Sequence, residues 1–245
     1  MKTEILGIQF DNLSREEAKA AGAAMLRSQD FHYAVTPNPE FILAADKDLE
    51  FQKILNKADL VLPDGIGVVY SAQILGRPLK GRVAGFDFAC DMLDVLDQLG
   101  GRLYLLGAKP GVAEEAGRQI LETHPNIVLC GVHDGYFKDS DPVARQVAEA
   151  RPDLLFVCLG APKQEKWIAR FGLLTGAKLA IGLGGCLDVF AGNVERAPEK
   201  WQKAGMEWAY RLMKEPKRIG RMAKLPLVLV KAARERTVGR RKGAL

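Results

Sequence analysis

Short apolar runs alternate with segments of helical composition along most of this 245-residue chain. The runs are nearly continuous in apolar residues, which is typical of strands buried on both faces of a parallel sheet. They lie at Ile5–Phe10, His32–Val35, Leu60–Leu62, Leu103–Leu106, Ile127–Val132, Leu154–Leu159 and Leu179–Leu183. The alternation predicts an α/β fold in which a mostly parallel sheet is covered by helices on both faces.

Helices are expected between these runs. Ser14 and Glu17 have the spacing of a capping box, which opens a helix that ends near Ser28. The other expected helices are Asp87–Leu99, Val112–Thr123, Pro142–Ala150 and Lys163–Leu174. In the last of them, one apolar face is formed by Trp167, Ile168, Phe171 and Leu174.

Composition narrows the class of protein. Apolar residues make up 48% of the chain and charged residues 27%, which indicates a globular rather than a disordered protein. The four cysteines form no Cys-x-x-Cys pair, so we expect neither disulfides nor a zinc site, and a reducing compartment. The chain has neither the ~18–20 apolar residues of a spanning helix nor the apolar segment of a signal peptide. We therefore expect a cytoplasmic protein that does not cross a membrane.

Charge is distributed unevenly. Residues 211–245 hold twelve basic and two acidic residues, a balance of +10, whereas the remaining 23 basic and 28 acidic residues give −5. A basic tail on an acidic body indicates a polyanionic partner, such as a membrane surface, a nucleic acid or a phosphorylated ligand. Composition changes near residue 195, so we predict an α/β body over residues 1–194 and a basic helical appendage over residues 195–245.

Polar residues follow the second and third apolar runs, at the strand ends where open α/β sheets bind ligands. Thr36 and Asn38 offer a hydroxyl and an amide, and Asp64 followed by Gly65 offers a carboxylate suited to a general base. The alternative is structural: Asn38 or Thr36 caps a helix over Pro39–Asp46, and Asp64 caps the helix that follows it.

A cation and a carboxylate flank the glycine turn that comes next. Arg82 is suited to holding a phosphate through two parallel hydrogen bonds. The alternative is an ion pair between Arg82 and Asp87.

Glycine turns follow three later strands, at Gly107, Gly160 and Gly184. The turn at Gly160 continues through Pro162 into a helix, with Gln164 and Glu165 in its first turn. Such a junction presents unpaired N–H groups and polar side chains at the sheet edge, where an anionic ligand is stabilised.

Two other function classes find weak support in these turns. Neither the turn at Gly107 nor the one at Gly184 completes Gly-x-Gly-x-x-Gly, because position 187 is Leu in the latter, which disfavours a nicotinamide-dependent oxidoreductase. Asp139 and Asp141 match the Asp-x-Asp pattern of metal-dependent sugar transferases, but their place before Pro142 favours a helix cap. We predict no metal and no cofactor.

Seven blocks of sequence occur in an order that resembles a known family. They are Thr36–Glu40, Leu62–Gly65, Arg82–Asp87, Gly160–Trp167, Gly184–Gly192, Arg196–Pro198 and Glu207–Pro216. Together they resemble the TagA/WecG/CpsF family of bacterial glycosyltransferases over essentially the whole chain, and its TagA branch most closely. One mild departure is Cys186, where the family more often has Ser or Ala.

The resemblance implies a Rossmann-like α/β body of the GT-E type and a particular reaction. That reaction is the inverting, metal-independent transfer of N-acetylmannosamine from its UDP donor. The acceptor is the 4-hydroxyl of undecaprenyl-diphosphate-linked N-acetylglucosamine, in synthesis of the wall teichoic acid linkage unit.

The resemblance also implies roles for individual residues. Asp64 becomes the general base, Thr36 and Gln164 bind or orient the sugar, and Arg82 contacts phosphate or sugar. Further substrate contacts are implied for Asn38, Gly65, Gly107, Gly160, Pro162, Glu165 and Gly184.

In the appendage, the matching arginines are Arg211, Arg218 and Arg221, which are implied to close over the site and stabilise the leaving diphosphate. The apolar residues Leu225, Leu227, Val228, Leu229 and Val230 lie among the basic residues Lys224, Lys231 and Arg234. This pattern is typical of a helix lying on anionic lipid, so we expect docking on the inner face of the cell membrane.

Two alternatives to this function remain at the level of sequence. One is the same chemistry with another donor, UDP-N-acetylmannosaminuronic acid or UDP-glucose, for another surface polysaccharide. The other is a nucleic-acid-binding protein that uses the basic tail, although Trp201–Tyr210 is amphipathic rather than typical of a stacking platform.

Overall fold

The computed structural model describes residues 2–198, 200–201, 209–210, 213 and 224–242. A six-stranded sheet forms the centre of the molecule. Its order is β4 (Leu60–Val61), β3 (His32–Val35), β8 (Leu179–Gly182), β7 (Leu154–Cys158), β5 (Arg102–Gly107) and β6 (Val128–His133). Every neighbouring pair is parallel, which confirms the predicted fold class.

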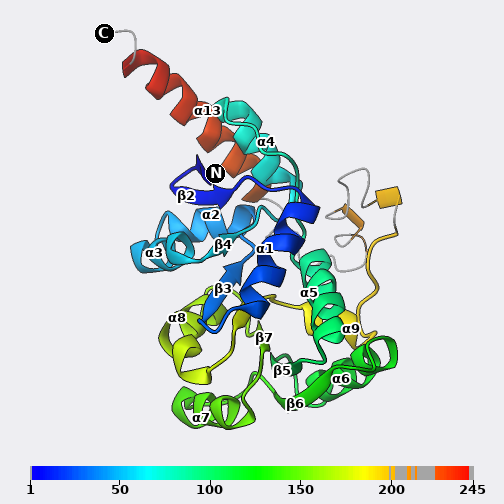
Figure 1. The fold of residues 1–245 in the computed structure, drawn as a ribbon. Helices are drawn as coiled ribbons and strands as arrows, with labels where there is room; N and C mark the ends of the chain where they lie inside the picture. The colour runs from blue at the N-terminus through cyan, green and yellow to red at the C-terminus, as the bar shows by residue number, and fades with distance from the viewer. Residues whose placement is uncertain (1, 199, 202–208, 211–212, 214–223, 243–245) are drawn as a thin grey trace.

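Helices cover both faces of this sheet (Figure 1). One face is covered by α1 (Arg15–Arg27), α5 (Gly85–Leu99), α6 (Val112–Thr123) and α9 (Cys186–Phe190). The other is covered by α2 (Pro39–Ala45), α3 (Leu49–Lys57), α7 (Ser140–Ala150) and α8 (Lys163–Thr175). Along a strand, successive side chains point alternately into the two cores. In β5, Leu103 and Leu105 pack against the first set of helices, and Tyr104 and Leu106 pack against the second.

The first apolar run forms a hairpin instead of a single strand. β1 (Lys2–Ile5) and β2 (Ile8–Asp11) pair antiparallel in a sheet of their own. Leu6 and Gly7 both have positive φ, 51° and 84°, as a two-residue hairpin turn requires. The hairpin is joined to the main sheet where the Asp11 carboxylate accepts a hydrogen bond of 2.9 Å from Val61 N.

Most of the expected helices are confirmed. α1 begins with the predicted capping box, in which Ser14 and Glu17 exchange backbone and side-chain hydrogen bonds. Asp139 caps α7 by accepting from Asp141 N at 3.1 Å. In α8, however, Leu174 is 55% exposed and Thr175 is turned inward, which corrects the predicted apolar face.

The last described helix packs on the body. α13 (Lys224–Lys242) lies against α2 and α4 (Ile66–Leu75), and Figure 1 shows it running beside α4. Val228 and Ala232 are fully buried there, one turn apart. Lys231 forms an ion pair with Asp46 at the end of α2.

This packing corrects part of the tail prediction. Val228 faces the protein core, while Leu227 and Val230 are exposed on the other side of the helix. Among the described residues, none of the helices has the length and apolar content needed to span a membrane.

Candidate active site

The strand order places the predicted site residues side by side along the carboxyl edge of the sheet. Asp64 follows β4, Thr36 follows β3, Gly184 follows β8, Gly160 follows β7 and Gly107 ends β5. These strands are consecutive neighbours in the sheet, although they come from distant parts of the sequence. The carboxyl edge of a parallel sheet is where such folds bind ligands.

Asp64 and Arg82 form an ion pair at this edge. Arg82 Nε lies 3.5 Å from Asp64 Oδ1, and the Asp64 side chain is 31% exposed. α4 starts with Gly65 as its N-cap residue and has no side-chain cap within the described part of the chain, so Asp64 does not cap it. The capping alternative for Asp64 is therefore wrong.

Backbone hydrogen bonds hold the segments around Asp64 together. Asp64 N donates to Pro37 O at 3.1 Å, which joins the turn after β4 to the turn after β3. Val83 N donates to Pro63 O at 3.0 Å, which brings the Arg82 segment to the same turn. Three stretches of chain thus meet at the candidate base.

Asp87 pairs with a residue that the sequence patterns did not assign to it. Arg196 Nη2 lies 2.6 Å from Asp87 Oδ1, and the Arg196 guanidinium stacks over the Phe86 ring at 4.9 Å. Among the described residues, Arg82 forms its ion pair with Asp64 and Asp87 pairs with Arg196, so the Arg82–Asp87 alternative is wrong. The contact ties the chain after residue 194 to the start of α5.

Thr36 lies against the start of α5. The Thr36 side chain is buried, and a Cβ added to Gly85 would lie 2.8 Å from Thr36 Oγ1. Glycine at position 85 is therefore needed for α5 to approach the end of β3 this closely. The sequence patterns contained this glycine, but nothing in them indicated its contact with Thr36.

Asn38 is the cap of α2. Its Oδ1 accepts hydrogen bonds from Glu40 N at 2.8 Å and from Phe41 N at 3.3 Å. The capping alternative for Asn38 is confirmed. The amide N–H groups of its side chain are not used by the cap.

Gln164 and Glu165 are buried below the edge rather than exposed at it. Gln164 Oε1 accepts hydrogen bonds from Gly160 N at 3.1 Å and from Gly184 N at 2.9 Å. Gln164 Nε2 donates to Glu165 Oε1 at 2.6 Å. Burial raises the pKa of the Glu165 carboxyl to about 7, against hydrogen bonds from Gln164 and from its own backbone N–H, which lower the pKa.

The predicted glycine positions have different surroundings. At Gly107, φ is 130° and a Cβ would lie 2.3 Å from Cys158 O, so close strand packing accounts for this glycine. At Gly160 and Gly184, φ is positive and a Cβ would meet nothing within 4 Å, so both turns border open space. Gly65 also has positive φ, with a Cβ site 3.4 Å from Pro39 Cδ.

Five helices begin at this edge without a side-chain cap, as far as the described residues extend. They are α4, α5, α6, α8 and α9, with Pro162 as the N-cap residue of α8. Uncapped first turns present N–H groups that stabilise anions such as a diphosphate. A carboxylate, a guanidinium and converging helix N-termini together suit the binding of a phosphorylated ligand and the removal of a proton from a hydroxyl.

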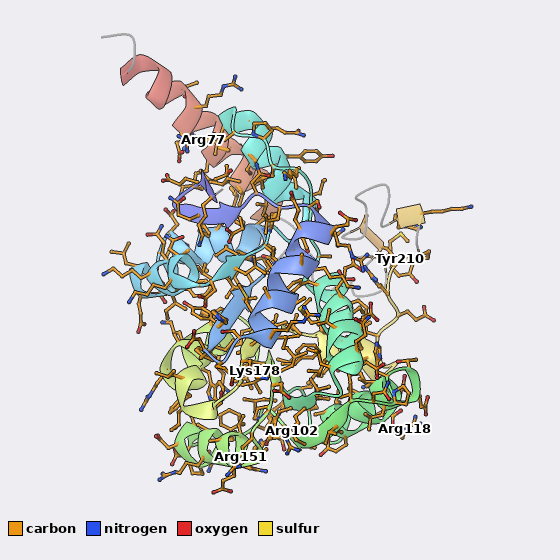
Figure 2. The ribbon with its side chains drawn as sticks, viewed as in Figure 1. Arg77, Arg102, Arg118, Arg151, Lys178 and Tyr210 are labelled. Atoms are coloured by element: carbon orange, nitrogen blue, oxygen red, sulfur yellow. The ribbon has the colours of Figure 1, made fainter. Side chains whose placement is uncertain are left out.

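Cations at the opposite edge of the sheet serve the fold. Figure 2 shows Arg102, Arg151 and Lys178 near one another, and Arg102 and Lys178 lie at the amino ends of β5 and β8. Arg102 Nη2 donates to Ala150 O at 2.8 Å, and Lys178 Nζ lies 3.0 Å from Asp153 Oδ1. These side chains join neighbouring loops, so they are not candidates for ligand binding.

Across the part of the chain that the structure describes, no cluster of three or more His, Cys, Asp or Glu residues is arranged to hold a metal ion. Arg211, Arg218 and Arg221 lie outside the described residues.

The fold and the edge site define an α/β protein with a carboxylate–guanidinium pair at its ligand-binding edge. The model of the Glycosyl transferase WecG/TagA/CpsF family matches residues 3–242. The chain therefore belongs to the WecG/TagA/CpsF family of glycosyl transferases, and it is a glycosyltransferase.

Several relatives carry one name, N-acetylglucosaminyldiphosphoundecaprenol N-acetyl-beta-D-mannosaminyltransferase. The relative from Bacillus subtilis (strain 168) is 42% identical over 191 residues, 78% of this chain and 75% of its own length. The one from Bacillus spizizenii is 41% identical over 194 residues, 79% of this chain and 76% of its own. The one from Staphylococcus aureus (strain MRSA252) is 33% identical over 236 residues, 95% of this chain and 92% of its own.

Proposed function

We propose that this protein transfers N-acetylmannosamine from UDP-N-acetylmannosamine to undecaprenyl-diphosphate-linked N-acetylglucosamine, in synthesis of the wall teichoic acid linkage unit. The names of the relatives support the transferred sugar and the acceptor. The observation that carries the proposal is the position of Asp64, partly exposed at the carboxyl edge and 3.5 Å from Arg82.

Asp64 acts as the general base in this proposal. It takes the proton from the acceptor's 4-hydroxyl while that oxygen attacks the anomeric carbon from the face opposite UDP, which inverts the configuration. Thr36, held at the same edge against Gly85, borders the place where the sugar reacts.

The leaving diphosphate is stabilised by cations and N–H groups without a metal ion. Arg82 is one cation at the edge, and the uncapped first turns of α8 and α9 supply N–H groups next to Gly160 and Gly184. We propose that Arg211, Arg218 and Arg221 add positive charge when the appendage, residues 195–245, closes over the body residues 1–194.

The lipid anchor of the acceptor requires the protein to work at a membrane surface. We propose that the outer side of α13 provides the contact, because Leu227, Val230 and Arg234 recur at i, i+3 and i+7 and all three are exposed. The reaction then takes place on the inner face of the cell membrane.

The experiment measures UDP release from UDP-N-acetylmannosamine with a lipid-linked N-acetylglucosamine analogue in EDTA. We expect wild type to be active and Asp64→Asn to lose about 10²–10⁴-fold in kcat, the usual contribution of a general base. UDP affinity, measured by calorimetry, should be the same in both proteins.

Asp139→Asn is the matched control. It removes a carboxylate of the Asp-x-Asp pattern, but Asn caps a helix as well as Asp, so α7 and activity should be unaffected. Turnover only with UDP-glucose or the uronic acid donor would change the assigned substrate and keep the mechanism. Absence of turnover with any UDP-sugar, or full activity of Asp64→Asn, would contradict the proposal.

A further inference from the structure

We propose that Glu165 is a positioning residue, whose carboxyl orients the Gln164 amide so that Gln164 fixes the spacing of the turns at Gly160 and Gly184. The inference rests on the proposed function in one respect, namely that these two turns border the UDP moiety of the donor. It changes the role of Gln164, which the family resemblance places in contact with the sugar.

Gln164 joins two turns that belong to different strands. Its Oε1 accepts one hydrogen bond from Gly160 N, after β7, and one from Gly184 N, after β8. Both lone pairs of this oxygen are therefore used by backbone groups. Because both turns border open space on their other side, the position of Gln164 sets the width of that part of the edge.

Glu165 helps to fix the orientation of the Gln164 amide, that is, which side its oxygen and its NH₂ group face. Gln164 Nε2 donates to Glu165 Oε1 at 2.6 Å. If the amide were reversed, its NH₂ group would face the N–H groups of Gly160 and Gly184, and its oxygen would face a carboxyl oxygen. The two backbone donors on one side and the carboxyl acceptor on the other thus specify a single orientation.

Packing against β8 fixes this pair in place. A Cβ on Gly182 would lie 2.9 Å from Gln164 Nε2 and 3.0 Å from Glu165 Oε1. Gln164 is 1% exposed and Glu165 0% exposed, so neither side chain reaches the open edge where a substrate would lie. They act from beneath the turns, through the backbone.

The Glu165 carboxyl destabilises the fold, so filling the core does not by itself explain a glutamate at this position. Glu165 Oε2 is buried and, among the described residues, has no hydrogen-bond partner. A buried carboxyl with one unsatisfied oxygen destabilises a fold relative to an apolar side chain of the same size.

The test compares Glu165→Gln with Glu165→Met. Gln keeps an oxygen that accepts from Gln164 Nε2, whereas Met has nearly the same length and no such acceptor. We measure amide hydrogen exchange at Gly160 and Gly184 by NMR and the affinity for UDP by calorimetry. Glu165→Met should speed exchange at both glycines and weaken UDP binding by about tenfold each, the effect of losing one buried hydrogen bond. Glu165→Gln should stay within about twofold of wild type.

A double-mutant cycle separates positioning from a general loss of stability. If Glu165 acts through Gln164, then Glu165→Met should have no further effect on UDP affinity in a Gln164→Met background. Thr175→Val is the matched control, since it removes a buried hydrogen bond of 2.6 Å to Gly172 O at the far end of the same helix. It should lower the melting temperature and leave both readouts unchanged.

Three outcomes would overturn the inference: wild-type exchange and affinity in Glu165→Met, additive effects in the cycle, or equal loss in Glu165→Gln and Glu165→Met. If Glu165→Met does not fold, Glu165→Leu takes its place, because Leu also has no acceptor for Gln164 Nε2. Hydrogen exchange does not depend on the reaction, so it tests the inference separately. Failure of the proposed function would appear in wild type as absent UDP binding and turnover.

Discussion

Two of the glycines with positive φ at the carboxyl edge, Gly107 and Gly160, are required for different reasons. Gly107 lies so close to β7 that a side chain has no space, since its Cβ would be 2.3 Å from Cys158 O. Gly160 has open space around it, so only its backbone conformation favours glycine there. The sequence shows the same residue type at both turns and cannot separate packing from exposure to a ligand.

Alanine substitution separates these two cases. We expect Gly107→Ala to destabilise the protein by at least about 3 kcal/mol, because strain in φ adds to a backbone clash. Gly160→Ala should cost about 1–2 kcal/mol, the price of the left-handed conformation alone. Urea unfolding measures both, and equal losses would contradict the packing argument.

The raised pKa of Glu165 makes stability depend on pH. In the unfolded chain this carboxyl has a pKa near 4.5, and in the folded protein it holds its proton up to about pH 7. The folded state therefore binds more protons between these values, so stability falls as pH rises through this window. Burial is the largest cause of the shift, and no charged side chain contributes to it within the described structure.

Glu165→Gln removes this titration. Relative to the variant, wild type should lose up to about 3 kcal/mol of stability between about pH 4.5 and pH 7. Urea unfolding at several pH values, with both proteins side by side, measures the difference. A difference that does not change with pH would show that the carboxyl is not buried in solution.

At the scale of elements, α13 shows how one helix serves two surfaces. Val228 and Ala232 are buried against α2 and α4, and Arg236 Nη1 donates to Ile74 O at 2.7 Å. Leu227 and Val230 are 58% and 50% exposed on the other side. The apolar residues of this segment are therefore of two kinds: some pack on the body and others are exposed on the outer side of the helix.

Substituting aspartate at Val228 and at Val230 tests whether these two sides of α13 have different roles. Val228→Asp buries an unpaired charge and should release the helix from α4, seen as faster hydrogen exchange over residues 226–237. Val230→Asp should leave the helix in place and reduce sedimentation with anionic vesicles. The same result for both variants would contradict the assignment of the two sides.

At the scale of the whole molecule, we expect the charge asymmetry to favour binding to an anionic surface. Residues 211–245 have a balance of +10 against −5 for the rest. Each Lys or Arg close to an anionic membrane adds about 1 kcal/mol of attraction. The acidic body is repelled by the same surface, so the tail side should face the lipid.

Salt tests this orientation with the full chain. Raising the salt from about 0.1 M to about 1 M shortens the Debye length from about 10 Å to about 3 Å. We expect sedimentation with anionic vesicles to fall steeply over this range and to be weak with neutral phosphatidylcholine vesicles at any salt. Retention by an oligonucleotide with no binding to vesicles would instead favour the nucleic-acid alternative.

Local pattern in the sequence accounts for much of the fold. The capping box of α1, the bounds of α6 and the cap of α7 at Asp139 depend on residues within one or two turns, so they were predictable. Leu174 was predicted on the apolar face of α8, but it is exposed. Gly172 packs against Phe31, which lies just before β3, and Thr175 turns inward to donate to Gly172 O, so these contacts set which side of the helix is buried. The sequence analysis did not predict α3, a nine-residue helix capped by Asp48.

The sequence by itself determined the α/β class and the residue types that gather at the strand ends, because periodicity and local caps act over a few residues. It could not determine which strands are neighbours. The order β4-β3-β8-β7 places Thr36 between Asp64 and Gly184, and long-range pairing of buried strands decides that order. Only the tertiary structure showed that Arg82 pairs with Asp64 and that Gln164 lies beneath two turns, because both facts depend on segments brought together across the sheet.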